Sequence, residues 1–112
     1  MMNYPELLQA IKKIRCEEVR VDSDEFYEMV IRKDSLKELS DVLGQYFGPP
    51  LKTAEAQPSR EASKAAEPYG GIWKGQTLYY LEHDRQAHVA MLWPWSDGVT
   101  ITLKMIQGRK AK

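Results

Sequence analysis

The amino-acid sequence predicts an α+β fold in which two helices pack on one face of a largely antiparallel five-stranded sheet. Two segments carry apolar residues at helical spacing, and the stretch 76–106 alternates apolar and other residues with the period of β-strands. Two shorter segments rich in β-branched and aromatic residues lie between the helical ones. The expected order is therefore α-β-β-α-(flexible linker)-β-β-β, within one small domain that spans residues 1–112.

The first helix is predicted over residues 5–15. Pro5 suits the first turn of a helix, and the apolar residues that follow recur at helical spacing: Leu7, Leu8, Ile11 and Ile14. Residues 17–22 and 26–32 are predicted as two strands joined by a short polar turn. Their pattern does not fix the register in which they pair.

The second helix is predicted over residues 35–47. Ser35 is a good N-cap, and Glu38 three residues later completes the pattern of a capping box. A continuous apolar stripe follows, made of Leu36, Leu39, Val42, Leu43, Tyr46 and Phe47. Gly48 can take a left-handed conformation, and the two prolines after it prevent the helix from continuing.

A flexible linker is predicted at about residues 50–70. The stretch from Lys52 to Pro68 contains no large apolar side chain, so it buries too little surface to offset the entropy of ordering. A transient helix is expected around residues 60–66. Three interpretations stay open for this linker: an inert surface insertion, a docking segment, and a hinge for domain swapping.

The last three strands are predicted as two consecutive hairpins. A short turn after His83 pairs Leu78 with Met91. A five-residue loop, Pro94–Gly98, then pairs Trp93 with Val99, and the same register pairs Met91 with Ile101 and Val89 with Leu103. This register places Trp93 in the core and leaves Tyr79 on a second, mixed face that is either lightly covered or used for binding.

Composition excludes several classes of function. The 112 residues hold 16 basic and 16 acidic side chains, so no net field attracts nucleic acid or an anionic membrane. No run of about 18 apolar residues is present to cross a bilayer. Cys16 is the single cysteine, which favours a reducing compartment, and we expect a cytoplasmic protein.

The sequence contains no recognisable catalytic motif. It lacks a nucleophile elbow, a phosphate-binding loop and a dinucleotide fingerprint. His83 and His88 do not have the spacing of a metal-ligand motif. Tyr79 on a sheet could stack nucleic-acid bases, but the basic and aromatic consensus of such platforms is missing. We therefore expect no cofactor and no metal, disfavour nucleic acid, and favour a non-enzymatic protein.

The candidate binding residues are Trp95, Trp73, Tyr79, Pro94 and Asp97. Trp95 lies in a loop, outside the strand alternation, so it is either a lid over the sheet or an exposed anchor for a partner. We expect a small cytoplasmic protein-interaction or accessory domain. Its partner would be another protein or a second copy, through a dimer or a domain swap. The alternative is a small-ligand-binding or enzymatic domain with a pocket lined by Trp73, Tyr80 and Trp93.

Overall fold

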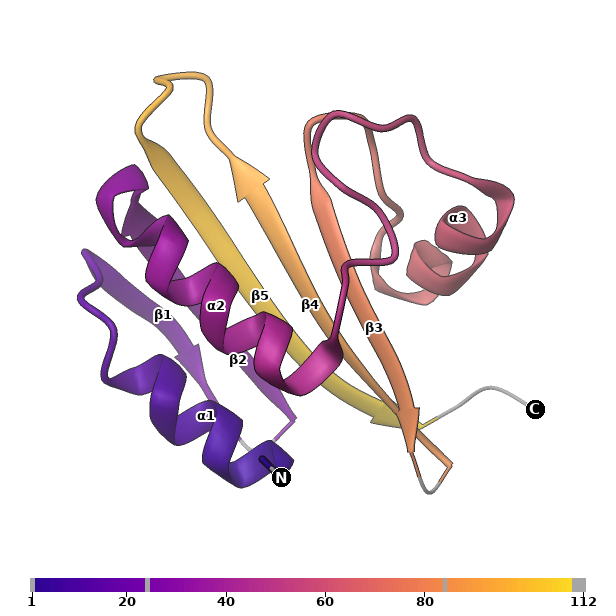
Figure 1. Ribbon diagram of the computed structural model, residues 1–112, viewed down its shortest axis with the longest axis horizontal. Helices are drawn as coiled ribbons and strands as arrows, with labels where there is room; N and C mark the ends of the chain where they lie inside the picture. Colours follow the sequence, from indigo (N-terminus) through magenta and orange to yellow (C-terminus); the bar gives the residue numbers. More distant parts are fainter. Residues whose placement is uncertain (1, 24, 84, 110–112) are drawn as a thin grey trace.

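The computed structural model describes residues 2–23, 25–83 and 85–109. Its five strands form one antiparallel sheet in the order β1-β2-β5-β4-β3, as Figure 1 shows. The elements are α1 (Tyr4–Lys12), β1 (Glu18–Asp22), β2 (Phe26–Arg32), α2 (Leu36–Phe47), α3 (Arg60–Ala66), β3 (Thr77–His83), β4 (Gln86–Pro94) and β5 (Thr100–Arg109). The predicted α+β class and element order are confirmed, with the short helix α3 inside the predicted linker.

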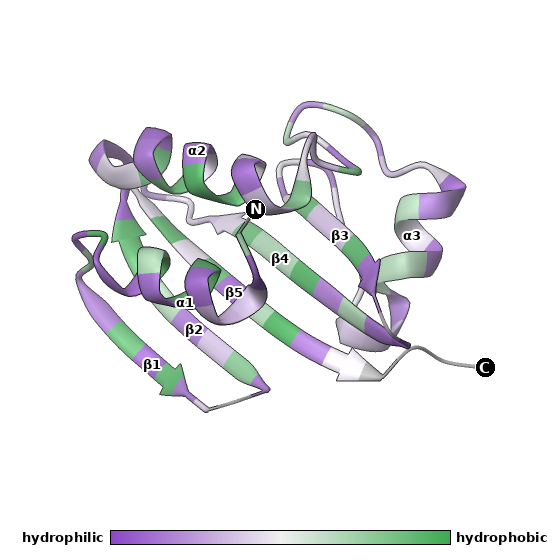
Figure 2. Cartoon of the chain, turned by 60° about the horizontal axis from the view of Figure 1, so that its bottom comes forward, coloured by the Kyte–Doolittle hydropathy of each residue, from purple (hydrophilic) through white to green (hydrophobic). Residues whose placement is uncertain are grey.

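Helices α1 and α2 lie side by side on one face of the sheet (Figure 2). The start of α1 is a capping box: the Asn3 side chain accepts from the backbone N–H of Glu6, and the Glu6 carboxylate accepts from that of Asn3, both at 2.9 Å. The capping box predicted for Ser35 is wrong. A 3₁₀ turn, η1 (Lys33–Ser35), precedes α2, and the Ser35 hydroxyl instead donates to the carbonyl of Arg15 at 3.0 Å.

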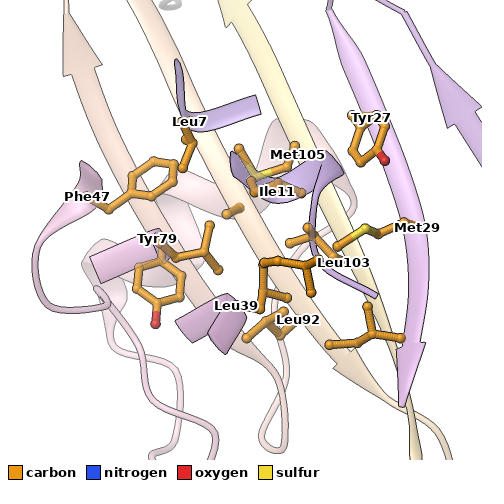
Figure 3. Packing of buried hydrophobic residues seen from close by; sticks show 14 of the residues in the cluster. Leu7, Ile11, Tyr27, Met29, Leu39, Phe47, Tyr79, Leu92, Leu103 and Met105 are labelled. Atoms are coloured by element: carbon orange, nitrogen blue, oxygen red, sulfur yellow. The ribbon is translucent and has the colours of Figure 1, made fainter. Parts of the chain in front are cut away.

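The main core lies between these two helices and the sheet (Figure 3). Both helices contribute their apolar stripe, and strands β2 to β5 contribute every second residue. The fully buried members of this cluster are Leu7, Ile11, Met29, Ile31, Leu39, Leu43, Ala90, Leu103 and Met105. Strand β5 lies at the centre of the sheet, and its residues Leu103 and Met105 are fully buried there.

The predicted register is confirmed for one late hairpin and wrong for the other. Leu78 pairs with Met91 as expected. Trp93, however, pairs with Thr102 rather than with Val99, a shift of three residues. The hairpin closes at Trp95, whose backbone N–H donates to the carbonyl of Thr100 at 2.8 Å. The turn therefore lies closer to β5 than a symmetric five-residue loop would place it.

An odd shift moves every side chain of one strand to the opposite face of the sheet. Val89 and Met91 consequently do not share a face with Leu103. They belong to a second apolar cluster with the α3 residues Ala62 and Ala66, on the face away from α1 and α2. Both faces of β3 and β4 therefore carry apolar residues. Helices α1 and α2 cover one face, and α3 covers the other.

The segment predicted as a linker packs against the sheet at two points. The first is Lys52, whose backbone N–H and carbonyl pair with Leu78 at 3.2 and 3.0 Å. The buried Lys52 ammonium donates to the carbonyls of Thr53 and Gln76, at 2.9 and 2.6 Å, and burial lowers its pKa. The second point is α3, which the sequence predicted only as a transient helix. Its alanines bury a small surface that a count of large apolar residues overlooks.

Candidate functional site

The β4–β5 hairpin presents its loop as an ordered turn. The carboxylate of Asp97 accepts from the backbone N–H groups of Val99 and Thr100 at 2.9 and 2.8 Å, and also from the Thr100 hydroxyl. These hydrogen bonds, that of the hydroxyl first, lower the pKa of Asp97. Gly98 has a positive φ of 78°, which suits glycine. Asp97 is exposed, and its contacts give it a structural role in shaping the loop.

Trp95 folds back from this loop onto the sheet. Its indole Nε1–H donates to the hydroxyl of Thr102 at 2.8 Å, and Thr102 is only 4% exposed. The guanidinium carbon of Arg20 lies 5.4 Å from the ring centre of Trp95. The residue nevertheless remains 41% exposed. Trp95 thus combines features of the lid and of the anchor: its position is fixed by the sheet, and its ring is accessible.

Charged side chains surround the two tryptophans of this hairpin. The Lys104 ammonium lies 3.8 Å from the ring centre of Trp93, and Arg20 forms ion pairs with Glu18 at 3.5 Å and with Glu28 at 3.7 Å. Helix α3 packs over the β3–β4 side of this face (Figure 2). We call the remaining area the Trp95 surface and define it as Arg20, Glu28, Trp93, Trp95 and Lys104.

Two predicted binding residues join the Trp95 surface or lie next to it, and one does not. Pro94 is exposed beside Trp95, and Asp97 is exposed in the same loop. Tyr79 is only 5% exposed and packs against Phe47 of α2, with ring centres 5.6 Å apart. Its expected place on an accessible face is therefore corrected: in the observed register, the face that carries Tyr79 is the one that α1 and α2 cover.

Trp73 lines a hollow that does not include the other two residues of the predicted pocket, Tyr80 and Trp93. The lining of this hollow is Ser63, Glu67, Gly70, Gly71, Ile72 and Trp73. Those two side chains pack against the second core cluster instead. The aromatic pocket expected from the sequence is therefore not assembled from these three residues.

His88 is buried in an aromatic cluster. It is 3% exposed, its ring centre lies 4.4 Å from that of Tyr4, and its Nδ1 is hydrogen-bonded to the Tyr46 hydroxyl. Its Nε2 has no hydrogen-bond partner among the described residues. Burial lowers the pKa of His88, and the nearby His83 adds to the effect. The described part of the chain holds no group of three or more His, Cys, Asp or Glu residues that could bind a metal ion.

Arg20 and Thr102, which both contact Trp95, are not among the residues predicted from the sequence. Arg20 lies at the irregularity in the pairing of β1 with β2, where the register shifts between Val19 and Val21. The pattern left that register open, so the facing of Arg20 could not be assigned. Thr102 pairs with Trp93 in the observed register, which places its hydroxyl under the indole of Trp95.

None of the described helices is both long enough and apolar enough to span a membrane. Comparisons of the chain with protein-family models, with curated proteins and with solved structures found no match.

Proposed function

We propose that this protein is a small protein-interaction domain whose contact area is the Trp95 surface. The observation that carries this proposal is that Trp95 is both fixed in position and accessible. Its indole N–H donates to Thr102 and the guanidinium of Arg20 lies over its ring, yet 41% of the residue is exposed. Tryptophan and arginine are the residues most enriched among those that dominate binding energy at protein interfaces. An aromatic ring that is already held in one position loses little further entropy when a partner covers it.

The surroundings of Trp95 suit a protein partner better than a small molecule. Small-molecule sites are concave and enclose most of the ligand. Trp95 instead lies on the sheet over Thr102 with its ring accessible, and the ion-paired Arg20 and Glu28 lie beside it. An apolar centre with a charged rim is typical of protein interfaces. The partner is then another protein or a second copy of this chain, and the single Cys16 favours the cytoplasm as its location.

Trp95→Ala should separate binding from folding. We expect the free energy of unfolding to fall by only about 1–2 kcal/mol, because one hydrogen bond and the contacts of a partly covered ring are lost. Capture of partners from the native cell should fall at least about tenfold, as it does when a central aromatic anchor is removed. Urea denaturation measures the first effect, and quantitative mass spectrometry of co-purifying proteins measures the second.

Ile31→Val is the matched control for stability. Ile31 is buried in the main core, away from both the Trp95 surface and Trp73, and its loss of one methyl group should cost about 0.5–1.5 kcal/mol, close to the loss expected for Trp95→Ala. This variant should capture partners as the wild-type protein does. The proposal fails if Trp95→Ala retains the full set of partners, or if it destabilises the fold by more than about 3 kcal/mol, the range of a core truncation.

A further inference from the structure

The three tryptophans of this chain differ in what covers their rings. Trp93 carries the ammonium of Lys104 at 3.8 Å from its centre, and Trp95 carries the guanidinium of Arg20 at 5.4 Å. Trp73 has no stacked cation from the described residues, and 58% of it is exposed. Tryptophan has the strongest cation-binding face of the aromatic side chains. The face of Trp73 is therefore open to a cation from outside the chain.

The ring of Trp73 is held in position by the turn before it. Gly70 and Gly71 have positive φ values of 102° and 86°, which favour glycine. A Cβ added at Gly71 would lie 3.3 Å from Cη2 of the indole, so the ring packs closely against this glycine. The backbone N–H of Trp73 donates to the side-chain carbonyl of Gln76 at 3.1 Å, which closes the loop from the other side.

A hollow of about 470 Å³ adjoins this ring. Its lining is Ser63, Glu67, Gly70, Gly71, Ile72 and Trp73, so among the described residues Glu67 supplies its formal charge. The site thus offers an aromatic face and a carboxylate to the same occupant. The hollow is open to solvent, which suits a side chain that projects from another protein.

We propose that this hollow binds an arginine side chain of a partner protein. A planar guanidinium can stack on a single indole while its edge forms two parallel hydrogen bonds with a carboxylate, here that of Glu67. Recognition of a quaternary or methylated ammonium relies on a cage of several aromatic rings, and Trp73 is the one aromatic residue in this lining. The site is separate from the Trp95 surface and does not rest on the function proposed for it.

The test is an NMR titration of the full chain with the peptide acetyl-Gly-Arg-Gly-amide. The signal followed is the indole N–H of Trp73, assigned by its loss in Trp73→Phe. We expect saturable binding with a dissociation constant of roughly 30–100 mM, since one exposed cation–π contact and one exposed ion pair are each weak. The same peptide with citrulline in place of arginine keeps the shape and lacks the charge. It should bind at least about fivefold more weakly.

Three variants of the chain test which residues bind the arginine peptide. Trp73→Ala, followed by the backbone N–H signals of Gly70 and Gly71 in the same lining, should abolish binding of the arginine peptide, and Glu67→Gln should weaken it about fivefold. Trp95→Ala should leave it unchanged, which separates this site from the Trp95 surface. Equal binding of the arginine and citrulline peptides would overturn the proposal. So would tighter binding of the corresponding lysine peptide, or an indole signal of Trp73 that does not shift.

Discussion

Leu103→Ala should lower the free energy of unfolding by about 3–5 kcal/mol, the range seen when a large buried aliphatic side chain is truncated and a cavity remains. Leu103 is fully buried at the centre of β5, the middle strand of the sheet, and it faces the core under α1 and α2. Small domains are stable by about 5–15 kcal/mol in total, so this variant should lose a large part of its stability. Urea denaturation followed by far-UV circular dichroism measures the change.

Val99→Ala is the matched control on the same hairpin. The symmetric register predicted from the sequence places Val99 opposite Trp93 in the core, whereas the structure exposes 40% of Val99 in the loop. We therefore expect Val99→Ala to cost less than about 1 kcal/mol. A loss for Val99→Ala as large as that for Leu103→Ala would contradict the observed register.

The stability of the protein should fall as the pH drops below about 6.5, and His88 should cause much of this fall. Burial, and then the nearby His83, hold the pKa of His88 below its ordinary value of 6.5 in the folded state. The unfolded chain therefore takes up a proton at a higher pH than the folded chain does. The contribution of the neutral His88 ring to stability is fully present above pH 6.5. It declines as the pH falls toward the pKa of His88 in the folded state, with a slope of up to about 1.4 kcal/mol per pH unit.

The physical reason lies in the surroundings of the ring. The ring centre of the His88 imidazole lies 4.4 Å from that of Tyr4 of α1, and its Nδ1 is hydrogen-bonded to the Tyr46 hydroxyl of α2, while its Nε2 is buried without a partner among the described residues. A proton on this ring would bury a charge with no anion beside it among the described residues. The same burial raises the pKa of Tyr4 to about 12, so neither tyrosine supplies a counter-charge near neutral pH.

Urea unfolding of the wild type and of His88→Phe at several values between pH 7.5 and 5 tests this expectation. Phenylalanine keeps a planar ring between Tyr4 and Tyr46, so the variant should fold and show a flatter dependence of stability on pH. His83→Gln, which leaves the buried ring in place, should keep most of the slope. Equal slopes for the wild type and His88→Phe would show that other groups cause the acid sensitivity.

Element types were predictable because periodicity reports burial directly. The stripe of α2 and the alternation of β5 each place one face in the core, and the structure retains both elements. Register was not equally predictable, because residues on both faces of β4 are apolar. When both faces are apolar, two registers of opposite parity fit the pattern equally well. The turn then decides, and the carboxylate of Asp97 selects a turn nearer β5.

The candidate site was predictable only in its most exposed residues. Trp95 and Trp73 stand outside the strand alternation, and both are exposed in the structure. Tyr79 was misassigned because its face depends on the register of a neighbouring hairpin. Of the partners that hold Trp95, Thr102 lies seven residues away in the same hairpin and depends on the register of that hairpin, whereas Arg20 comes from the distant strand β1. Local pattern cannot supply the contact with Arg20, because it follows from the order of strands in the sheet.

The most direct measurement of the proposed function is photo-crosslinking in the native cell with a benzoylphenylalanine residue at position 96 or at position 37. Ser96 is exposed beside Trp95 in the β4–β5 loop, whereas Lys37 is exposed on α2, on the opposite face of the sheet. We predict a discrete crosslinked protein at position 96 that disappears when Trp95→Ala is added, and none at position 37. Equal crosslinking at both positions, or a position-96 adduct that survives Trp95→Ala, would contradict the assignment of the Trp95 surface as the contact area.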